Sequence, residues 1–385
     1  MDFRLSEEHA AFAESVRRFA QDKLAPGALE RAHSPQFPWD AARLIADQGL
    51  MGIAFPEEDG GQGGTLMHAV LAIQEVALAC PKSADIVQAG NFGPVRTFVE
   101  YATPEQKQRF LPDLLAGRKL VALGMSEPDA GSAVTELKTS ARIEGDEVVI
   151  NGSKVFSTHS PEAGLFLIYV RFAPGVGGIG SVLVERGTPG FQVGTPSAFM
   201  SGETWSQLYF EECRIPKENI LLGEGGFKKQ ISGFNVERLG NSARSLALGR
   251  HCFNIARQHA QDRKQFGRAL FEFQGIQWKF AEMKLKLESA QLLLYQAAME
   301  GEHGLPSAQS TALAKLACNQ AGWDVANEAL QVMGGMGYSQ ESIVEYCVRR
   351  TRGWMIAGGS IEMLKNRIAE GVFDRQFPQR PPKAA

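Results

Sequence analysis

The chain has 385 residues, of which 44% are hydrophobic and 22% are charged, and its formal net charge is -3. At about 150 residues per domain, this length predicts two or three domains with buried cores. The composition is typical of a globular protein. The long basic tracts that accompany nucleic-acid binding are missing. We therefore do not expect the protein to bind polyanions.

The N-terminal sequence MDFRLSEEHAAF carries acidic residues where a signal peptide carries positive charge, and no apolar run approaches the length of a membrane span. These features predict a cytoplasmic protein without a membrane segment. The cysteines are odd in number and scattered, so we expect buried, inert thiols rather than disulfides or a zinc site. They are Cys80, Cys213, Cys252, Cys318 and Cys347.

The first 118 residues or so are predicted to be helical. Ser6 can cap a first helix that ends at Pro26-Gly27. Apolar residues then recur at helical spacing in three segments, 39–50, 66–79 and 104–115. The glycine-rich segment 60–64 resembles a phosphate loop only superficially, because no Lys-Ser/Thr pair follows it, and we interpret it as a turn.

From Leu120 the apolar pattern changes to that of β-strands. Asn151-Gly152 lies between two apolar segments, 148–150 and 154–156, and predicts a hairpin because this pair favours a type I′ turn. Further strands are predicted at 165–172, at 181–185 and around Tyr209-Phe210.

Helical periodicity returns after Glu224 and predicts helices at 227–260, 273–299, 308–333 and 360–373. The proline-rich end, residues 376–385, is predicted to fray. The sequence therefore predicts an α+β protein with three domains. These are an N-terminal helical domain (1–118), a middle β domain (119–225) and a C-terminal helical domain (226–385).

Four separated motifs carry the functional signal. VALGMSEPDAGS, at 121–132, begins as a strand and breaks into a loop whose backbone N–H groups are free to meet a polar ligand, although alone it is typical of a simple turn. NGSKVFST (151–158), RKQFG (263–267) and QVMGGMGY (331–338) follow it. In this order, from about Phe3 to about Ala369, they resemble the acyl-CoA dehydrogenase family of flavoproteins. The resemblance implies bound FAD, a middle antiparallel β domain and a C-terminal four-helix bundle.

The resemblance also implies which residues hold the flavin. The backbone around Leu123 and Met125, with Ser126 and Thr158, would meet the polar edge of the isoalloxazine. Phe156 would lie against the ring at a position where the family usually has Trp. Ser132 would bind phosphate or ligand, and the Asp that commonly follows it is Ala133 here. The residues expected at the flavin are Leu123, Met125, Ser126, Ser132, Phe156, Thr158, Ser360 and Glu362.

A second group resembles positions that reach the adenosine diphosphate half of FAD from a neighbouring subunit. Its members are Arg263, Phe266, Gln274, Gln331 and Gly335. An arginine fork suits a diphosphate, and glycine lets the backbone approach closely. The resemblance therefore implies that a monomer cannot complete the site and that the protein is a homotetramer, built as a dimer of dimers.

The oxidation of an acyl thioester between Cα and Cβ needs a carboxylate that removes the α-proton. Many family members carry this Glu near the C-terminus, where this chain has Gly358. Members of the isovaleryl and long-chain types carry it on the first helix after the β domain, which corresponds to Glu237. Arg238 lies on the apolar stripe of that helix and Glu237 at its edge, so the alternative is a structural Glu-Arg pair or a solvent-facing edge. We predict that Glu237 is the base and that the N–H of Gly358 polarises the thioester carbonyl.

Ser132, Asn235, Arg238, Asn241 and Ala357 are the expected substrate contacts. Asn241 and Ser242 are more polar than usual in relatives, and Lys82 and Asp85 occur where relatives line the acyl end. These residues suggest a short, branched or polar-tipped acyl tail, unless they lie at the rim or on the surface.

The expected activity is FAD-dependent dehydrogenation of an acyl-CoA to the 2-enoyl-CoA, with an electron-transferring flavoprotein as acceptor. One alternative is the same fold with other chemistry, as an oxidase, monooxygenase, desulfinase or carrier-protein-linked dehydrogenase. The other is a non-catalytic relative that binds flavin or nucleic acid.

Overall fold

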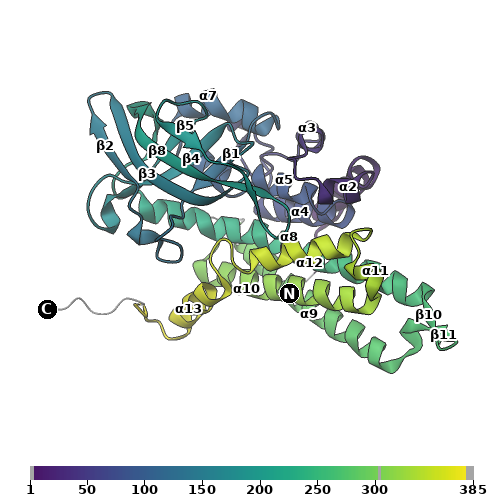
Figure 1. Ribbon diagram of the computed structural model, residues 1–385. Helices are drawn as coiled ribbons and strands as arrows, with labels where there is room; N and C mark the ends of the chain where they lie inside the picture. The colour runs from purple at the N-terminus through teal and green to yellow at the C-terminus, as the bar shows by residue number, and fades with distance from the viewer. Residues whose placement is uncertain (1–3, 302–304, 379–385) are drawn as a thin grey trace.

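The computed structural model describes residues 4–301 and 305–378, and it begins with a helical domain (Figure 1). Ser6 caps the first helix as predicted, because its side chain accepts a hydrogen bond from the His9 backbone N–H. The helices of this part are α1 (Glu7–Phe19), α2 (Ala28–His33), α3 (Trp39–Asp47), α4 (Leu66–Ala79), α5 (Ser83–Ala89), α6 (Pro94–Tyr101) and α7 (Pro104–Leu115). The periodicity did not predict α5 and α6, which are short and largely buried.

The middle of the chain forms a nine-stranded, mainly antiparallel sheet. Its strands are β1 (Val121–Gly124), β2 (Ser140–Glu144), β3 (Glu147–Thr158), β4 (Leu165–Arg171), β5 (Ile179–Glu185), β6 (Phe191–Val193), β7 (Ser197–Ala198), β8 (Thr204–Pro216) and β9 (Ile220–Leu222). The order is β6-β8-β3-β2-β4-β5-β9, with β1 parallel to β4 and β7 on β8. The central strands β4 and β5 are buried almost throughout, as their apolar sequences require.

The hairpin predicted at Asn151-Gly152 is wrong. Strand β3 runs through both residues, and the register against β8 shifts there in a bulge. A Cβ at Gly152 would lie 2.7 Å from the Thr139 Cα, so this glycine allows close approach of two backbones rather than a turn. The β2–β3 hairpin turns instead at Gly145-Asp146, where Gly145 has a φ of +63°.

The C-terminal part is a bundle of long helices. Its elements are α8 (Phe227–Asp262), β10 (Lys264–Gln265), β11 (Arg268–Ala269), α9 (Gln274–Glu300), α10 (Ala308–Met333), α11 (Gly335–Tyr338), α12 (Ile343–Trp354) and α13 (Ile361–Val372). The four-helix bundle is confirmed: α8 and α10 contact each other, and each of them also contacts α9 and α12. Of the terminal segment predicted to fray, residues 379–385 lie outside the described part.

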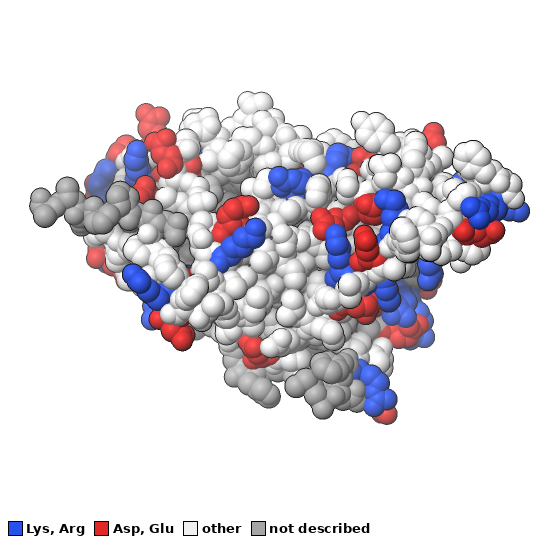
Figure 2. Space-filling view, turned by 90° about the horizontal axis from the view of Figure 1, so that it is seen from below, with Lys and Arg blue, Asp and Glu red and all other residues white. Residues whose placement is uncertain are grey.

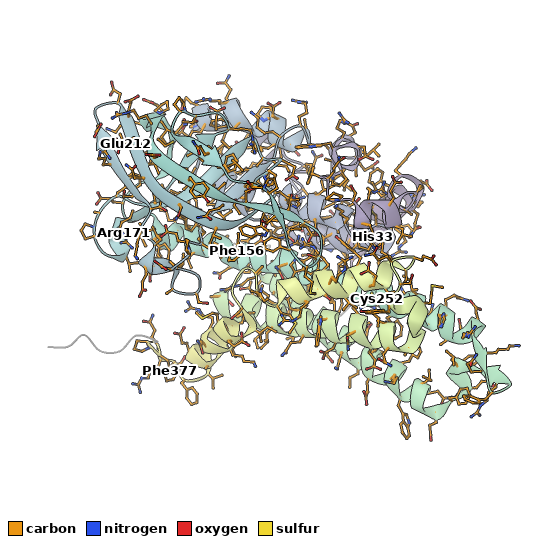
Figure 3. All side chains as sticks on the ribbon, in the orientation of Figure 1. His33, Phe156, Arg171, Glu212, Cys252 and Phe377 are labelled. Atoms are coloured by element: carbon orange, nitrogen blue, oxygen red, sulfur yellow. The ribbon has the colours of Figure 1, made fainter. Side chains whose placement is uncertain are left out.

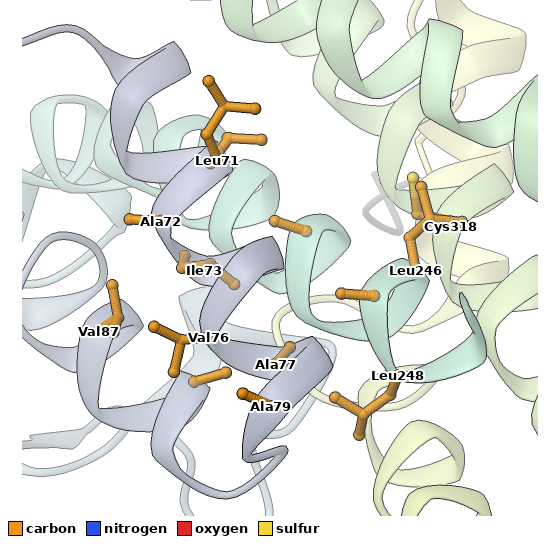
Figure 4. Close-up of a cluster of buried hydrophobic side chains, with 14 of the residues drawn as sticks. Leu71, Ala72, Ile73, Val76, Ala77, Ala79, Val87, Leu246, Leu248 and Cys318 are labelled. Atoms are coloured by element: carbon orange, nitrogen blue, oxygen red, sulfur yellow. The ribbon is translucent and has the colours of Figure 1, made fainter. Parts of the chain in front are cut away.

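Helix α8 lies between the sheet and the rest of the bundle (Figure 1). It packs on α4, α9, α10 and α12, and Figure 4 shows Leu246 and Leu248 of α8 between Leu71–Ala79 of α4 and Cys318 of α10. The single apolar stripe expected on α8 is therefore wrong in its central part, because every residue from Leu239 to Gly249 is buried.

A buried ion-pair network joins the three parts of the chain. Asp85 of α5 bonds to Arg244 of α8 at 2.7 Å and to Arg350 of α12 at 2.8 Å. Arg350 also bonds to Glu203, next to β8, at 3.0 Å. Both guanidinium groups lie over the Trp354 ring, 4.6 and 4.7 Å from its centroid. Each charged side chain of this network is thus paired with an opposite charge from another part of the fold.

The five cysteines are free and buried, as predicted. Within the described residues, no helix combines the length and the apolar character needed to cross a bilayer. On the face shown in Figure 2, acidic and basic side chains are interspersed.

We expect Asp85→Asn to lower the free energy of unfolding by about 3–5 kcal/mol, because it leaves the buried Arg244 without a carboxylate partner and Arg350 with Glu203 alone. Burial alone would raise the pKa of Asp85, but Arg350 and Arg244 outweigh it and hold this pKa below its usual value. The stabilisation is therefore present above the ordinary carboxyl pKa and is lost only as the pH falls through the depressed value. Denaturant unfolding measures it, with Asp113→Asn in the exposed pair with Arg118 as the control. Equal small effects of both variants would contradict the prediction.

Candidate active site

The two β-domain motifs lie side by side. The Ser157 hydroxyl donates to the Leu123 carbonyl at 2.9 Å, and the Val155 N–H donates to the Ser126 carbonyl at 2.8 Å. These bonds tie the end of β3 to the loop after β1. The exposed Ser132 follows in that loop, and the exposed Thr158 ends β3.

A buried ion pair underlies this loop. Lys154 is fully buried and donates to Glu127 Oε1 at 2.8 Å and to the Met125 carbonyl at 3.3 Å. Glu127 also accepts from the backbone N–H groups of Lys138 and Thr139. Burial lowers the pKa of Lys154 to about 8, and Glu127 opposes this shift. The pair fixes the carbonyl of Met125, one of the residues expected at the flavin.

Phe156 presents an aromatic surface beside these polar groups. Its backbone has a φ of +57° within a bulge of β3, and its side chain is 57% exposed. Positive φ in a bulky residue is uncommon and often marks a functional position. The Trp205 ring lies 4.8 Å away. Figure 3 shows Phe156 where the sheet meets the C-terminal helices. An exposed aromatic surface two residues before Thr158, at the end of the same strand, is of a kind that fits an isoalloxazine ring.

The residues expected at the adenosine diphosphate half lie elsewhere. Arg263, Phe266, Gln274, Gln331 and Gly335 are all exposed. They belong to the β10–β11 end of the bundle, which projects away from the sheet (Figure 1). Phe266 is 95% exposed and has a φ of +52°. Within one chain, the structure does not bring this group to the two β-domain motifs.

Glu237 is a residue of α8, and its side chain faces α5. The Gln88 side-chain amide donates to its Oε1, whereas its Oε2 is buried without a hydrogen-bond partner. A Cβ at Gly93 would lie 3.1 Å from that Oε2, so the glycine leaves room for the carboxylate. Burial raises the pKa of Glu237 to about 7, although Arg244, Lys315 and Gln88 oppose the shift. The solvent-facing alternative for Glu237 is therefore wrong, and no Glu237–Arg238 ion pair forms among the described residues.

Gly358 lies in the turn between α12 and α13. Gly358 and Gly359 have φ values of +68° and +91°, a left-handed pair that strongly favours glycine. A Cβ at Gly358 would lie 4.0 Å from the Asn241 amide nitrogen and 3.7 Å from Lys315 Cε. The structure thus brings Asn241 to the turn that carries Gly358 and Ala357.

Other predicted residues also lie at this junction. Arg238 donates to Asn235 at 3.0 Å, and both are partly buried on α8. Ser360 caps α13, and Glu362 lies exposed in its first turn. The rim-or-surface alternative for Lys82 and Asp85 is wrong, because both side chains are buried. Lys82 donates to backbone carbonyls of Ser34 and Gln36.

Sequence reasoning missed several residues of this site: Gln88, Arg244, Lys315, Asn319 and Trp354. A sequence signal existed for two of them. Lys315 and Asn319 occur one turn apart in the apolar helix α10 and are fully buried. Buried lysines are rare unless their donors are satisfied, so such a pair indicates an internal polar contact.

The chain matches known proteins over nearly its whole length. Residues 6–118, 122–213 and 224–373 match the N-terminal, middle and C-terminal domains of acyl-CoA dehydrogenase, respectively. A short-chain specific acyl-CoA dehydrogenase from Clostridium acetobutylicum is 35% identical, with 97% of this chain and 100% of that protein covered. A 3-sulfinopropanoyl-CoA desulfinase from Paraburkholderia xenovorans is 31% identical, with coverages of 98% and 99%. The structure of butyryl-CoA dehydrogenase from Megasphaera elsdenii superposes with a TM-score of 0.91 at 30% identity, with coverages of 97% and 100%.

Fold and site together define a flavin-dependent oxidoreductase of acyl thioesters. The chain belongs to the acyl-CoA dehydrogenase family. Its cofactor is FAD, and its reaction is the α,β-dehydrogenation of an acyl-CoA.

We expect Lys154→Met to weaken FAD binding by about tenfold or more, because it leaves the Glu127 carboxylate buried without its counter-ion and frees the Met125 carbonyl. The flavin-to-protein absorbance ratio of the purified variant, followed by FAD titration, measures the loss. Lys138→Met is the matched control, since Lys138 pairs with Asp129 on the exposed side of the same loop. Full FAD occupancy in Lys154→Met would contradict the prediction.

Proposed function

We propose that Glu237 is the base that removes the α-proton of the acyl-CoA. The observation that supports this role is the unpartnered Oε2 of a desolvated carboxylate. A buried carboxylate with a free acceptor oxygen and a pKa of about 7 is suited to proton abstraction near neutral pH. Position 358, where many relatives carry the base, has no side chain.

The other residues hold the thioester in place. We propose that the Gly358 N–H polarises its carbonyl oxygen, which stabilises the negative charge that develops as the α-proton leaves. Asn235, Arg238, Asn241, Ala357 and Ser132 contact the substrate. When bound, FAD supplies the acceptor for the hydride that leaves the β-carbon.

In this proposal, Leu123, Met125, Ser126, Ser132, Phe156, Thr158, Ser360 and Glu362 surround the flavin. Phe156 and Trp205 provide an apolar surface against the ring, and Thr158 and Ser126 are available to its polar edge. We also propose domain boundaries near residues 118 and 225, in the connections between α7 and β1 and between β9 and α8.

Glu237→Gln should abolish the bleaching of the flavin by acyl-CoA under anaerobic conditions while FAD stays bound, because the amide cannot accept the proton. We expect a loss of at least about 10³-fold in the reduction rate. In the wild type, this rate should rise as the pH increases through about 7, since the base acts in its deprotonated form. Glu58→Gln, at an exposed position, is the control. Unchanged flavin reduction in Glu237→Gln would remove the assignment.

We further propose that the acyl group is short. Arg244 lies two helical turns beyond Glu237 on α8, and a seven-residue step on a helix returns to nearly the same face. Its guanidinium is held between Asp85 and the Trp354 ring. Gln88 and Phe92 pack against Gly240 on the α5 side. These side chains leave a long apolar tail no obvious path beyond Glu237. The short-chain specific relative and the butyryl-CoA dehydrogenase structure agree with this proposal.

Arg244→Ala should extend the acyl range, because it removes the side chain that blocks the space while Asp85 keeps its bond to Arg350. We expect the ratio of kcat/KM for octanoyl-CoA over butanoyl-CoA to rise by about tenfold or more. Arg250→Ala is the matched control, since Arg250 lies further along α8 and pairs with Glu288 near the surface. A ratio that stays the same in Arg244→Ala, or a wild type that prefers octanoyl-CoA, would contradict the proposal.

The proposed assembly is a homotetramer, a dimer of dimers. Helix α9 exposes Trp278, Leu285, Leu292 and Met299 at seven-residue intervals, which places them on one face. Exposed apolar stripes of this kind usually mark interfaces. A second copy would cover this face and would bring the Arg263 group to the FAD of its neighbour.

The reduced flavin must pass on two electrons, and we propose an electron-transferring flavoprotein as the acceptor. A cytoplasmic location completes the proposal. The five free thiols support it, because thiols stay reduced in that compartment.

A further inference from the structure

Lys315 of α10 is a fully buried cation that forms no ion pair within the described residues. Its ammonium group donates to three backbone carbonyls, those of Trp354 at 3.2 Å, Ala357 at 2.9 Å and Gly359 at 2.9 Å. A lysine ammonium has three N–H donors, so each donor has an acceptor. A neutral amine has only two hydrogens and would leave one carbonyl facing a lone pair. The geometry therefore suits the charged form.

One of these carbonyls ends α12, and the other two belong to the turn that carries Gly358. The Ala357 carbonyl and the Gly358 N–H are parts of one peptide unit, which is planar and trans. In a trans peptide, the N–H points opposite to the C=O. The bond from Lys315 to the Ala357 carbonyl therefore aims the Gly358 N–H away from the lysine. The left-handed conformations of Gly358 and Gly359 let the carbonyls on both sides converge on one ammonium.

Lys315 also acts on Glu237. The charged groups whose fields reach Lys315 are Arg238, Glu237 and Arg244, all on α8. Burial lowers the pKa of Lys315 to about 7, and Glu237 opposes the shift. In return, Arg244 and Lys315 favour the anionic form of Glu237 against its burial. The catalytic carboxylate and the buried ammonium thus favour each other's charged state.

We propose that Lys315 is a positioning residue of the dehydrogenation: its ammonium, bonded to the Ala357 carbonyl, orients the Gly358 N–H toward the thioester oxygen, and its positive charge favours the anionic form of Glu237. This inference rests on the proposed roles of Glu237 and Gly358. Lys315 does not touch the substrate in this proposal. It acts on the Gly358 N–H through the hydrogen bonds to the turn, and on Glu237 through its electric field.

Lys315→Met removes the charge and all three hydrogen bonds at similar side-chain length. We expect kcat to fall about 100-fold, as for the loss of an oxyanion donor. The acid limb of kcat/KM should move to higher pH by about one unit, because Glu237 loses a nearby opposite charge. Infrared spectra of a bound enoyl-CoA should show a smaller red shift of the thioester C=O stretch than in the wild type.

Asn319→Leu is the matched control. Asn319 lies one turn from Lys315 and donates to the same Trp354 carbonyl at 2.6 Å, but it carries no charge. This variant should loosen the turn and lower kcat, with the acid limb unchanged. A purely structural lysine would behave in the same way. Lys315→Met with the acid limb and the C=O stretch of the wild type would overturn the proposal.

Lys315→Arg covers the case in which Lys315→Met does not fold. It keeps the charge but replaces the compact ammonium with a planar fork that cannot meet the three carbonyls in the same way. We expect a reduced kcat with the wild-type acid limb, and a shifted limb in this variant would overturn the role of the charge. Glu237→Gln separates the two proposals. If it stays active, the base assignment itself fails. If it is inactive while both Lys315 variants keep wild-type profiles, only the role of Lys315 fails.

Discussion

The burial of charge where α5, α8 and α12 meet is the constraint on which the rest of the structure depends. Asp85 neutralises Arg244 and Arg350, and Arg350 reaches on to Glu203 beside the sheet. A buried ion pair adds little net stability, but removing one member is strongly destabilising because its partner stays buried without a counter-charge. The network therefore fixes how the helical domain, the sheet and the bundle meet. The α5–α8 contact that it sets also positions Gln88 against Glu237, so the same charges that hold the three parts together place the proposed base.

The two halves of the site share one construction. In each half, a turn next to the reacting groups places a carbonyl on a buried lysine, Lys154 at Met125 and Lys315 at Ala357. The two lysines differ in what balances their positive charge. Lys154 has a carboxylate partner, Glu127, whereas Lys315 has only backbone carbonyls and the field of Glu237. A buried cation held by carbonyl dipoles alone is sensitive to a nearby negative charge. In our proposal, this sensitivity couples the turn at Gly358 to the ionisation of Glu237.

Sequence reasoning reached the three-part fold and its long helices because their apolar periodicities extend over many residues. It failed at Asn151-Gly152, where the reason for the glycine is the close approach of Thr139, the residue just before β2. No local pattern contains that neighbour. It also failed on α8, where one apolar stripe was expected but helices α4, α9, α10 and α12 pack around its buried central part. Glu237 was proposed from the resemblance to a known family, whereas Gln88, Arg244 and Lys315 meet the site through contacts between distant segments, such as that of Gln88 with Glu237. Such contacts are visible only after folding.

The proposed position of the base on α8 has a structural consequence for the turn between α12 and α13. Gly358 adopts a φ of +68°, which a side-chain-bearing residue reaches only with strain. With the carboxylate on α8, residue 358 needs no side chain, and the Gly358-Gly359 pair can wrap its carbonyls around Lys315. A helix buried on all sides beyond Leu239 holds Glu237 more rigidly than a turn between two helices would. The cost is desolvation of the carboxylate, which raises its pKa. The positive charges of Arg244 and Lys315 offset part of that cost, because they favour the carboxylate form. Desolvation therefore makes the proposed base stronger, while the two charges keep part of the Glu237 population ionised near neutral pH.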